Sequence, residues 1–203
     1  MILSLIKQKA IKQYCSLPCS YVAGSAVFHE NDVCDRVGII VEGEILMNHY
    51  TAYGDEIQLS ILNKGDVFGD FLIFSSHPYY PGNLIAKSDT VIITIPKEAL
   101  ETLLITSPSF RHYFLQNLSE KALTFNRDNK MLSQPTLHAK LTYWIESEMV
   151  RQKTTQVYYH NKTTLAKHLR VRRPSLSREM SRLKKTGKIG CDQHRVWLKE
   201  MDK

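Results

Sequence analysis

Long apolar runs are absent from this chain of 203 residues. Lys7, Lys9 and Lys12 interrupt the apolar start of the sequence, and no later apolar run approaches the roughly 18 to 20 residues needed to span a bilayer. The chain begins at Met1 and carries no targeting pattern. We therefore expect a soluble, cytoplasmic protein without a membrane partner.

Cysteine is scarce, and the four cysteines contain no CxxC pair. In a cytosolic chain they are expected to be free thiols rather than a disulfide framework. Cys15, Cys19 and Cys34 could be combined into an iron–sulfur or zinc site with Cys191 or a histidine, but their spacing differs from the common motifs. We expect no metal and no cofactor, and a redox role of the first three cysteines stays open.

Positive charge is concentrated in the last third of the chain. Residues 133–203 hold 16 Lys and Arg against 6 Asp and Glu, whereas residues 1–132 hold 11 against 14. A near-neutral front and a strongly basic back suggest two domains, with a polyanion as partner of the second. A solvated basic face without any partner would give the same charge balance.

Residues 21–96 consist of short β-prone runs separated by glycine-containing turns, such as Glu42-Gly43 and Lys64-Gly65-Asp66. Runs such as 37–41 and 90–95 recur at close intervals, which is typical of an all-β sandwich or roll and not of βαβ units. After Pro96 the apolar spacing becomes helical. We expect a first, β-rich domain over residues 1–106, which the resemblance described below implies to be a sensor domain.

A long helix is expected over residues 107–133, starting at Ser107-Pro108. An apolar stripe runs along it, with Leu123 one position off: Phe110, Phe114, Leu118, Phe125. A helix of about 20 to 25 residues must bury such a stripe, and a second copy of the same helix would do so. We therefore predict that Phe110, Phe114, Leu118 and Phe125 form a dimer interface. Packing of the stripe on the chain's own β-domain is the alternative.

The segment from residue 134 to residue 203 begins at the helix-breaking pair Gln134-Pro135. Residues 136–150 are expected to form a helix, residues 154–159 a short strand and residues 188–199 a small hairpin. Between them, Leu165, Ala166 and Leu169 give a short helix its apolar face, and Val171 lies in the following turn.

The second short helix is apolar on one side and basic on the other. Leu176, Met180 and Leu183 have the spacing of a buried face, while the other positions carry arginine, lysine and serine. Such a helix suits the major groove of DNA, where arginine pairs bidentately with guanine. Arg173 and Ser175, at its N-terminal end, are the predicted base readers. The predicted DNA-binding residues are Thr163, Thr164, Arg172, Arg173, Pro174, Ser175, Ser177, Arg178, Arg182, Lys184 and Lys185.

These motifs resemble the Crp/Fnr superfamily of bacterial transcription regulators. The similarity covers the glycine framework at residues 38–45, 54–59 and 65–70, and the helix-turn-helix at residues 164–183. It implies an α+β fold with a cyclic-nucleotide-binding-like β-roll (jelly roll), a long central dimerisation helix and a C-terminal winged helix-turn-helix. It further implies a homodimer on a palindromic site in double-stranded DNA, with RNA polymerase as a candidate partner.

The same resemblance suggests that the effector is not cyclic AMP. Members that bind it carry a Gly-Glu pair for the ribose and, about ten residues later, an Arg-Ser pair for the phosphate. Here these pairs are Gly69-Asp70 and Tyr80-Pro81, and tyrosine and proline offer at most one hydroxyl to a phosphate. An unknown small-molecule effector or a pocket filled by its own side chains stays open. The predicted pocket residues are Gly69, Asp70, Phe71, Tyr79, Tyr80, Phe125 and Asn126.

Three other functions are considered from the residues. Haem bound at His77 would make the chain a gas sensor, but a lone loop histidine is more often structural. Asp66, Asp70 and His77 could be assembled into an acid/base site, yet no nucleophile is paired with a base, so we expect no enzyme. The alternative to a DNA-binding regulator is a cyclic-nucleotide-type sensor module that regulates a protein or RNA partner.

Overall fold

A first compact unit of the computed structural model spans residues 1–119 and a second spans residues 120–203. The structure describes residues 2–50, 53 and 56–199. The 54–59 motif therefore lies partly outside the described residues. The boundary falls within one helix, whereas the predicted segmentation set residues 107–133 apart from both domains.

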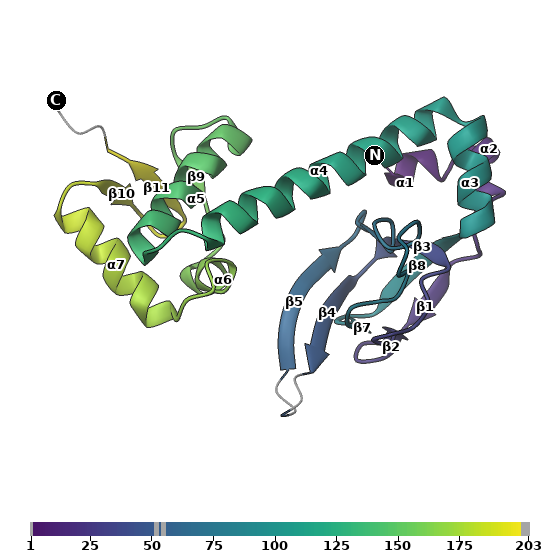
Figure 1. Cartoon of the computed structure of the whole chain (residues 1–203), viewed down its shortest axis with the longest axis horizontal. Helices are drawn as coiled ribbons and strands as arrows, with labels where there is room; N and C mark the ends of the chain where they lie inside the picture. Colours follow the sequence, from purple (N-terminus) through teal and green to yellow (C-terminus); the bar gives the residue numbers. More distant parts are fainter. Residues whose placement is uncertain (1, 51–52, 54–55, 200–203) are drawn as a thin grey trace. The chain divides into compact units, whose positions relative to one another are not determined.

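Helices α1, α2 and α3 and a set of antiparallel strands build the first unit, together with the start of α4 (Figure 1). Their bounds follow in chain order: α1 (Ile2–Leu5), α2 (Lys9–Lys12), β1 (Cys19–Tyr21), β2 (Ala26–Phe28), β3 (Arg36–Glu42), β4 (Glu44–Tyr50), β5 (Glu56–Asn63), β6 (Val67–Phe68), β7 (Asn83–Ala86), β8 (Thr90–Pro96) and α3 (Lys97–Thr106). Helix α4 (Pro108–Leu132) begins in this unit.

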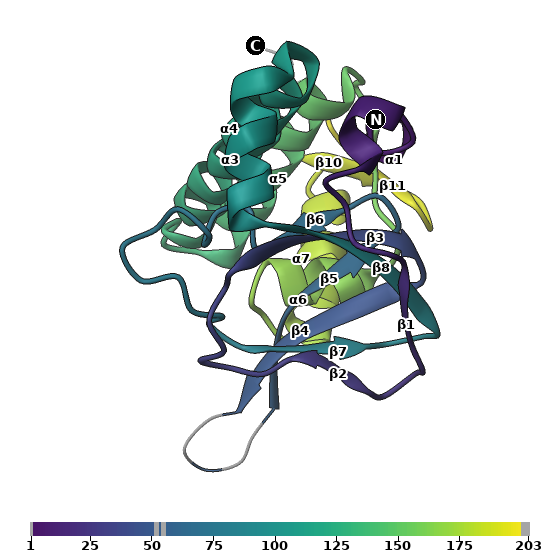
Figure 2. The ribbon, with the colours of Figure 1, turned by 90° about the vertical axis from the view of Figure 1, so that its right-hand side faces the viewer.

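The strands of the first unit form two antiparallel sheets, with orders β1-β8-β3-β6 and β2-β7-β4-β5 among the described residues. Figure 2 shows the two sheets as separate layers. Ile39 and Ile92 from one sheet and Ile45 and Leu84 from the other are buried in one apolar core. This arrangement confirms the predicted β-roll.

The first turns of α4 pack into the same core. Phe110 and Phe114 are buried together with Leu100 and Leu103 of α3, and the two phenylalanine rings stack with their centroids 6.3 Å apart. These two side chains are not free to face another molecule. The expectation that Phe110 and Phe114 belong to a dimer interface is therefore wrong, because the β-roll and α3 already cover them.

The second unit continues with α5 (Leu137–Gln152), β9 (Val157–Tyr158), α6 (Lys162–His168), α7 (Arg173–Lys185), β10 (Ile189–Cys191) and β11 (Arg195–Leu198). Its strands form an antiparallel sheet of order β10-β11-β9. Leu141 and Ile145 of α5, Leu165 of α6 and Leu176 of α7 meet in a separate core. The predicted α+β class and the helix-turn-helix followed by a hairpin are confirmed.

A buried carboxylate fastens α5 to strand β9. Glu148 accepts hydrogen bonds from the guanidinium of Arg151 and, at 2.8 Å, from the side-chain amide of Gln152. Gln152 in turn accepts a hydrogen bond from the backbone N–H of Tyr158 at 3.0 Å. Burial raises the pKa of Glu148, but the hydrogen bonds from Arg151 and Gln152 outweigh burial and leave this pKa below its ordinary value.

Among the helices of the described ranges, none combines the length and apolarity that a bilayer crossing needs.

Candidate nucleic-acid interface and ligand pocket

Helix α6 begins at Asn161, whose side chain accepts a hydrogen bond from the backbone N–H of Thr164 at 2.8 Å. This N-cap satisfies a donor that a helix start leaves unpaired. Leu165 and Ala166 face the core, so Thr163 and Thr164 are left exposed on the other side. Both predicted threonines therefore lie on the surface at the start of α6.

The turn between α6 and α7 depends on one residue with a left-handed backbone. Arg170 has a φ of 52°, a conformation that costs a residue with a side chain about 1–2 kcal/mol relative to glycine. The N–H of Val171 then donates to the carbonyl of Ala166 at 2.9 Å, which closes the turn. Arg172 follows as the N-cap of α7.

Helix α7 has one buried face and one basic face. Leu176, Met180 and Leu183 are buried, and Pro174 occupies the first turn, where its missing N–H costs little. Ser175 and Ser177 are half-buried. The exposed predicted side chains of this segment are Arg172, Arg173, Pro174, Arg178, Arg182, Lys184 and Lys185.

The ammonium of Lys184 is engaged within the protein. It donates a hydrogen bond to the carbonyl oxygen of Cys191 in β10 at 2.9 Å. This contact ties the end of α7 to the hairpin. Lys184 therefore has a structural contact as well, and its contact with nucleic acid stays a prediction; Lys185, the next residue, is also exposed.

Arg182 is held by a carboxylate that the sequence analysis did not single out. Glu179 accepts from Arg182 at 2.6 and 3.0 Å, and its carboxylate lies 3.7 Å from the imidazole of His138. The hydrogen bonds from Arg182 lower the pKa of Glu179. This pairing fixes the direction of the guanidinium and offsets part of its charge. The i, i+3 spacing of the two residues could have indicated the pair.

Further polar groups on this side of the unit were missed by the sequence analysis. Ser181 helps to line a shallow hollow of 330 Å³ on α7, together with Ser177, Arg178, Arg182 and Lys185. Lys188 and Arg195 are exposed on the hairpin formed by β10 and β11. An exposed cation in a hairpin has no periodic pattern, so the sequence offered only the overall basic charge as a signal.

The hairpin itself is held by a close approach of backbone and ring. A Cβ atom at Gly190 would lie 2.1 Å from the indole of Trp197, so that only glycine fits opposite this ring. At the tip, Asp192 accepts from the backbone N–H groups of His194 and Arg195 at 2.9 and 2.7 Å. The hairpin therefore has a fixed shape beside α7.

In the first unit, Gly69 and Asp70 begin the segment in which the sequence places a ligand pocket. Gly69 has a φ of 77°, and a Cβ atom there would lie 2.9 Å from the carbonyl oxygen of Arg36. Asp70 is buried and accepts a hydrogen bond from the side-chain amide of Asn117 at 2.5 Å. The carboxylate expected to face a ligand is therefore engaged with helix α4.

The side chain of Tyr80 lies in the apolar interior of the first unit. It is only 1% exposed, and its ring stacks on Phe28 with the centroids 4.6 Å apart. Burial raises the pKa of the Tyr80 hydroxyl far above its ordinary value. This hydroxyl has no nitrogen or oxygen hydrogen-bond partner among the described residues, and its polar neighbour is the weakly hydrogen-bonding thiol of Cys34.

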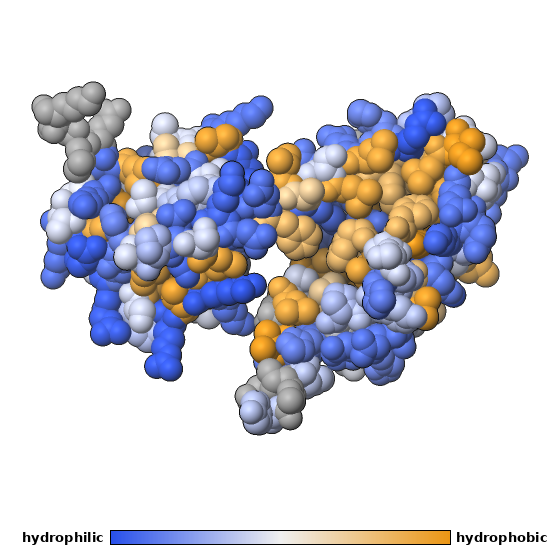
Figure 3. Space-filling view, viewed as in Figure 1, coloured by the Kyte–Doolittle hydropathy of each residue, from blue (hydrophilic) through white to orange (hydrophobic). Residues whose placement is uncertain are grey.

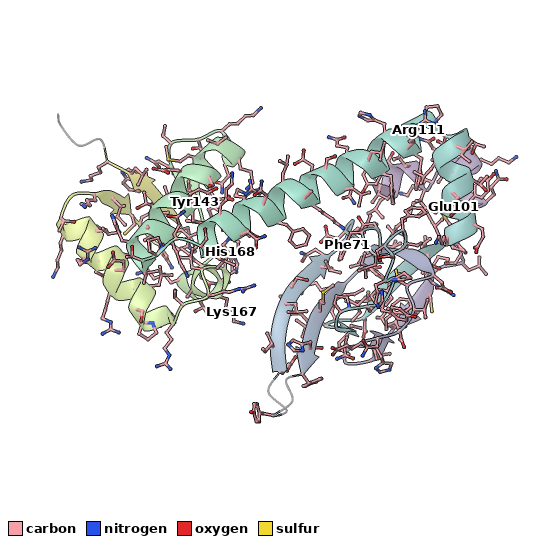
Figure 4. The ribbon with its side chains drawn as sticks, in the orientation of Figure 1. Phe71, Glu101, Arg111, Tyr143, Lys167 and His168 are labelled. Carbon is pink, nitrogen blue, oxygen red and sulfur yellow. The ribbon has the colours of Figure 1, made fainter. Side chains whose placement is uncertain are left out.

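The remaining predicted pocket residues do not join this cluster. Phe71, labelled in Figure 4, is partly exposed, and Tyr79 is 44% exposed next to the ring of His77. Phe125 and Asn126 are exposed residues of α4 in the second unit. The structure thus brings Gly69, Asp70 and Tyr80 together and leaves the others at the surface.

The cysteines occupy different surroundings. Cys34 is buried and Cys19 is exposed on β1, while Cys15 and Cys191 are half-buried. Burial raises the pKa of the Cys34 thiol. Within residues 2–50, 53 and 56–199 there is no group of three or more His, Cys, Asp or Glu side chains arranged to hold a metal ion.

A family comparison matches residues 18–107 to the cyclic nucleotide-binding domain. The chain is similar to the global nitrogen regulator of Synechococcus elongatus, at 26% identity over 103 residues, which covers 49% of this chain and 46% of that protein. It is also similar to the CRP-like cAMP-activated global transcriptional regulator of Mycobacterium tuberculosis, at 24% identity over 55% of this chain and 49% of that protein. The chain spans about half the length of the curated relatives it matches.

Among solved structures, a CooA variant from Carboxydothermus hydrogenoformans is similar over 98% of this chain and 91% of its own, with a TM-score of 0.70 and 16% identity. This likeness supports the fold alone, since the identity is low.

Proposed function

Because the chain belongs to the Crp/Fnr superfamily, we propose that it is a cytoplasmic, sequence-specific transcription regulator that binds a palindromic operator as a homodimer. The whole-protein activity is inferred from the arrangement of α6, α7 and the hairpin. RNA polymerase is a candidate partner of the bound dimer.

The basic face of α7 is the observation that carries this proposal. Its apolar side is buried, so the helix is held with Arg173 and Arg178 directed outward, and Arg172 and Lys185 lie at its two ends. The N-terminal residues of such a helix reach base edges, and the later cations contact phosphates. Thr163 and Thr164, exposed at the start of α6, add hydroxyl groups that can donate hydrogen bonds to DNA phosphates. On the face seen in Figure 3, hydrophilic residues predominate in this unit.

Helix α4 supports the homodimer. With Phe110 and Phe114 buried, the most exposed large apolar side chains of α4 are Leu115 (56%), Leu123 (62%) and Phe125 (59%), and Leu118 is half-buried. Leu115, Leu118, Ala122 and Phe125 follow one another at intervals of three, four and three residues, as in a coiled-coil seam. A second copy of α4 would bury this seam and pair two recognition helices about 34 Å apart.

We propose that the effector, if one is needed, is not cyclic AMP. Tyr80 occupies the interior, and Asp70 is bonded to Asn117, so neither a cationic fork nor an open carboxylate is available. A titration that gives a dissociation constant in the low micromolar range for cyclic AMP would refute this.

The proposed activity is tested by selecting bound sequences from a random duplex pool with the purified chain. We expect a palindrome whose half-sites lie about one helical turn apart. Arg173→Ala should then weaken binding to the selected site by about 1–3 kcal/mol and relax the preference at one base position. If Arg173→Ala leaves specific binding unchanged, the assignment of the base-reading end is wrong.

Lys185→Ala should weaken binding to all sequences alike and reduce the slope of log K against log salt by about 1. Lys9→Ala, which removes an exposed lysine of the first unit, is the charge-matched control and should leave the slope unchanged. Binding to structured RNA without enrichment of any duplex would favour the alternative function.

A further inference from the structure

The first unit contains a cleft that is separate from the group formed by Gly69, Asp70 and Tyr80. It has a volume of 480 Å³ and lies where the N-terminal helices and the segment before β1 meet strands β3 and β8. Its size falls within the range of about 300–1,000 Å³ that is common for small-molecule sites. Tyr80, Asp70 and the predicted pocket residues are not among the residues that line it.

The walls of the cleft are mainly apolar. Leu3 and Ile6 come from the N-terminal segment, Val41 from β3 and Ile93 from β8. Ile6 is buried. Leu3, Val41 and Ile93 are half-buried, so each of these three side chains keeps some exposed apolar surface in the cleft. An aliphatic chain placed here would lose contact with water on several sides.

Three lysines stand around this apolar floor. Lys7 and Lys12 come from the N-terminal segment and Lys64 from the turn between β5 and β6, and all three are exposed. No aspartate or glutamate belongs to the lining. None of the three ammonium groups forms an ion pair or hydrogen bond with a residue that the structure describes. Three like charges repel one another, so an anion placed between them gains from all three.

We propose that this cleft binds a free aliphatic carboxylate, such as a medium-chain fatty acid, with its tail on Leu3, Ile6, Val41 and Ile93 and its carboxylate between the lysines. The apolar walls account for the tail and the uncompensated lysines for the head group. The site does not depend on the proposed DNA-binding function, since all of its residues belong to the first unit.

The test is isothermal titration calorimetry of the full chain with octanoate, decanoate and dodecanoate below their micelle concentrations. We expect one site per chain and an affinity that rises about fourfold for each added methylene group, until the tail fills the cleft. Dodecyltrimethylammonium, with the opposite charge on the same tail, should bind at least about tenfold more weakly. Equal affinity for the two head groups would overturn the proposal.

Variants test the lysines directly. The double variant K12Q/K64Q should weaken decanoate binding about tenfold at low ionic strength, because two of the three cations are lost. K9Q, which removes the exposed lysine one turn before Lys12 but outside the lining, is the matched control and should bind normally. Since these lysines are exposed, all variants should melt like the parent chain. If K9Q and K12Q/K64Q behave alike, the head-group assignment is wrong.

Two further probes separate the sources of an anionic head group. Decyl phosphate should bind no more tightly than decanoate, and tighter binding would replace the carboxylate with a phosphate ligand. The chain should not co-sediment with phosphatidylglycerol vesicles. Sedimentation with vesicles, combined with no heat from decanoate, would assign the lysines to a membrane surface and overturn the proposal.

Discussion

Removing one oxygen atom from Tyr80 is expected to make the protein more stable. The hydroxyl is buried and has no nitrogen or oxygen partner among the described residues, only the thiol of Cys34 as a polar neighbour. An unsatisfied buried polar group costs about 1–3 kcal/mol, and the neighbouring Cys34 thiol offsets little of this, since sulfur is a weak acceptor. Tyr80→Phe should therefore raise the free energy of unfolding by about 1 kcal/mol.

Removing the whole ring should have the opposite effect. The Tyr80 ring is buried against Phe28, and truncation of such a side chain to alanine costs about 3–5 kcal/mol. Tyr79 is the matched control, because it is the adjacent tyrosine but 44% exposed. Tyr79→Phe should change stability by less than about 0.5 kcal/mol.

Urea unfolding followed by far-UV circular dichroism measures these differences. Both tryptophans, Trp144 and Trp197, belong to the second unit, so their fluorescence follows that unit in the same titration. A decrease of 1 kcal/mol or more on Tyr80→Phe would mean that the hydroxyl has a good partner. A loss below about 1 kcal/mol on Tyr80→Ala would mean that the ring does not fill the interior.

Three other predictions follow from single residues. Arg170→Gly should stabilise the second unit by about 1 kcal/mol in urea unfolding followed by tryptophan fluorescence, because glycine adopts a positive φ without strain, and a destabilised variant would contradict this. The lowered pKa of Glu148 means that its bond with Arg151 stabilises the fold above a pH of about 4.3 and that this contribution is lost as the pH falls through the lowered value. Glu148→Gln should remove that part of the acid dependence, and an unchanged pH profile of stability would count against it. A thiol reagent at pH 8 should modify Cys19 rapidly and Cys34 slowly, since burial disfavours the Cys34 thiolate, and equal rates measured by peptide mass spectrometry would disprove the difference.

The periodic parts of this fold could be predicted from the sequence. The long helix expected over residues 107–133 is α4, and the buried face of α7 consists of the expected Leu176, Met180 and Leu183. Glycine-punctuated β-prone runs indicated the sheets of the first unit. In each case the spacing of apolar residues reflects the geometry of one element, so local sequence was enough.

What could not be predicted depends on contacts between distant residues. An apolar stripe on a helix does not say which molecule covers it, and for Phe110 and Phe114 the cover is the chain's own β-roll. In the sequence, Lys184 and Lys185 are equivalent basic residues. The hydrogen bond from Lys184 to the carbonyl of Cys191 joins residues that are seven positions apart and is visible only in the structure. Tyr80, like its neighbour Tyr79, lies in a loop without periodicity, so no local pattern distinguishes the buried Tyr80 from the exposed Tyr79.

The contact between Gly190 and Trp197 has a consequence for how this hairpin can evolve. Any side chain at position 190 would collide with the indole opposite, so the first step toward a different pair must remove the tryptophan. That step removes the ring that covers the hairpin. Alanine or serine can replace Gly190 only after the ring is gone. We therefore expect descendants of this sequence to keep both residues or to have lost both, and the hairpin next to α7 to diverge by paired changes.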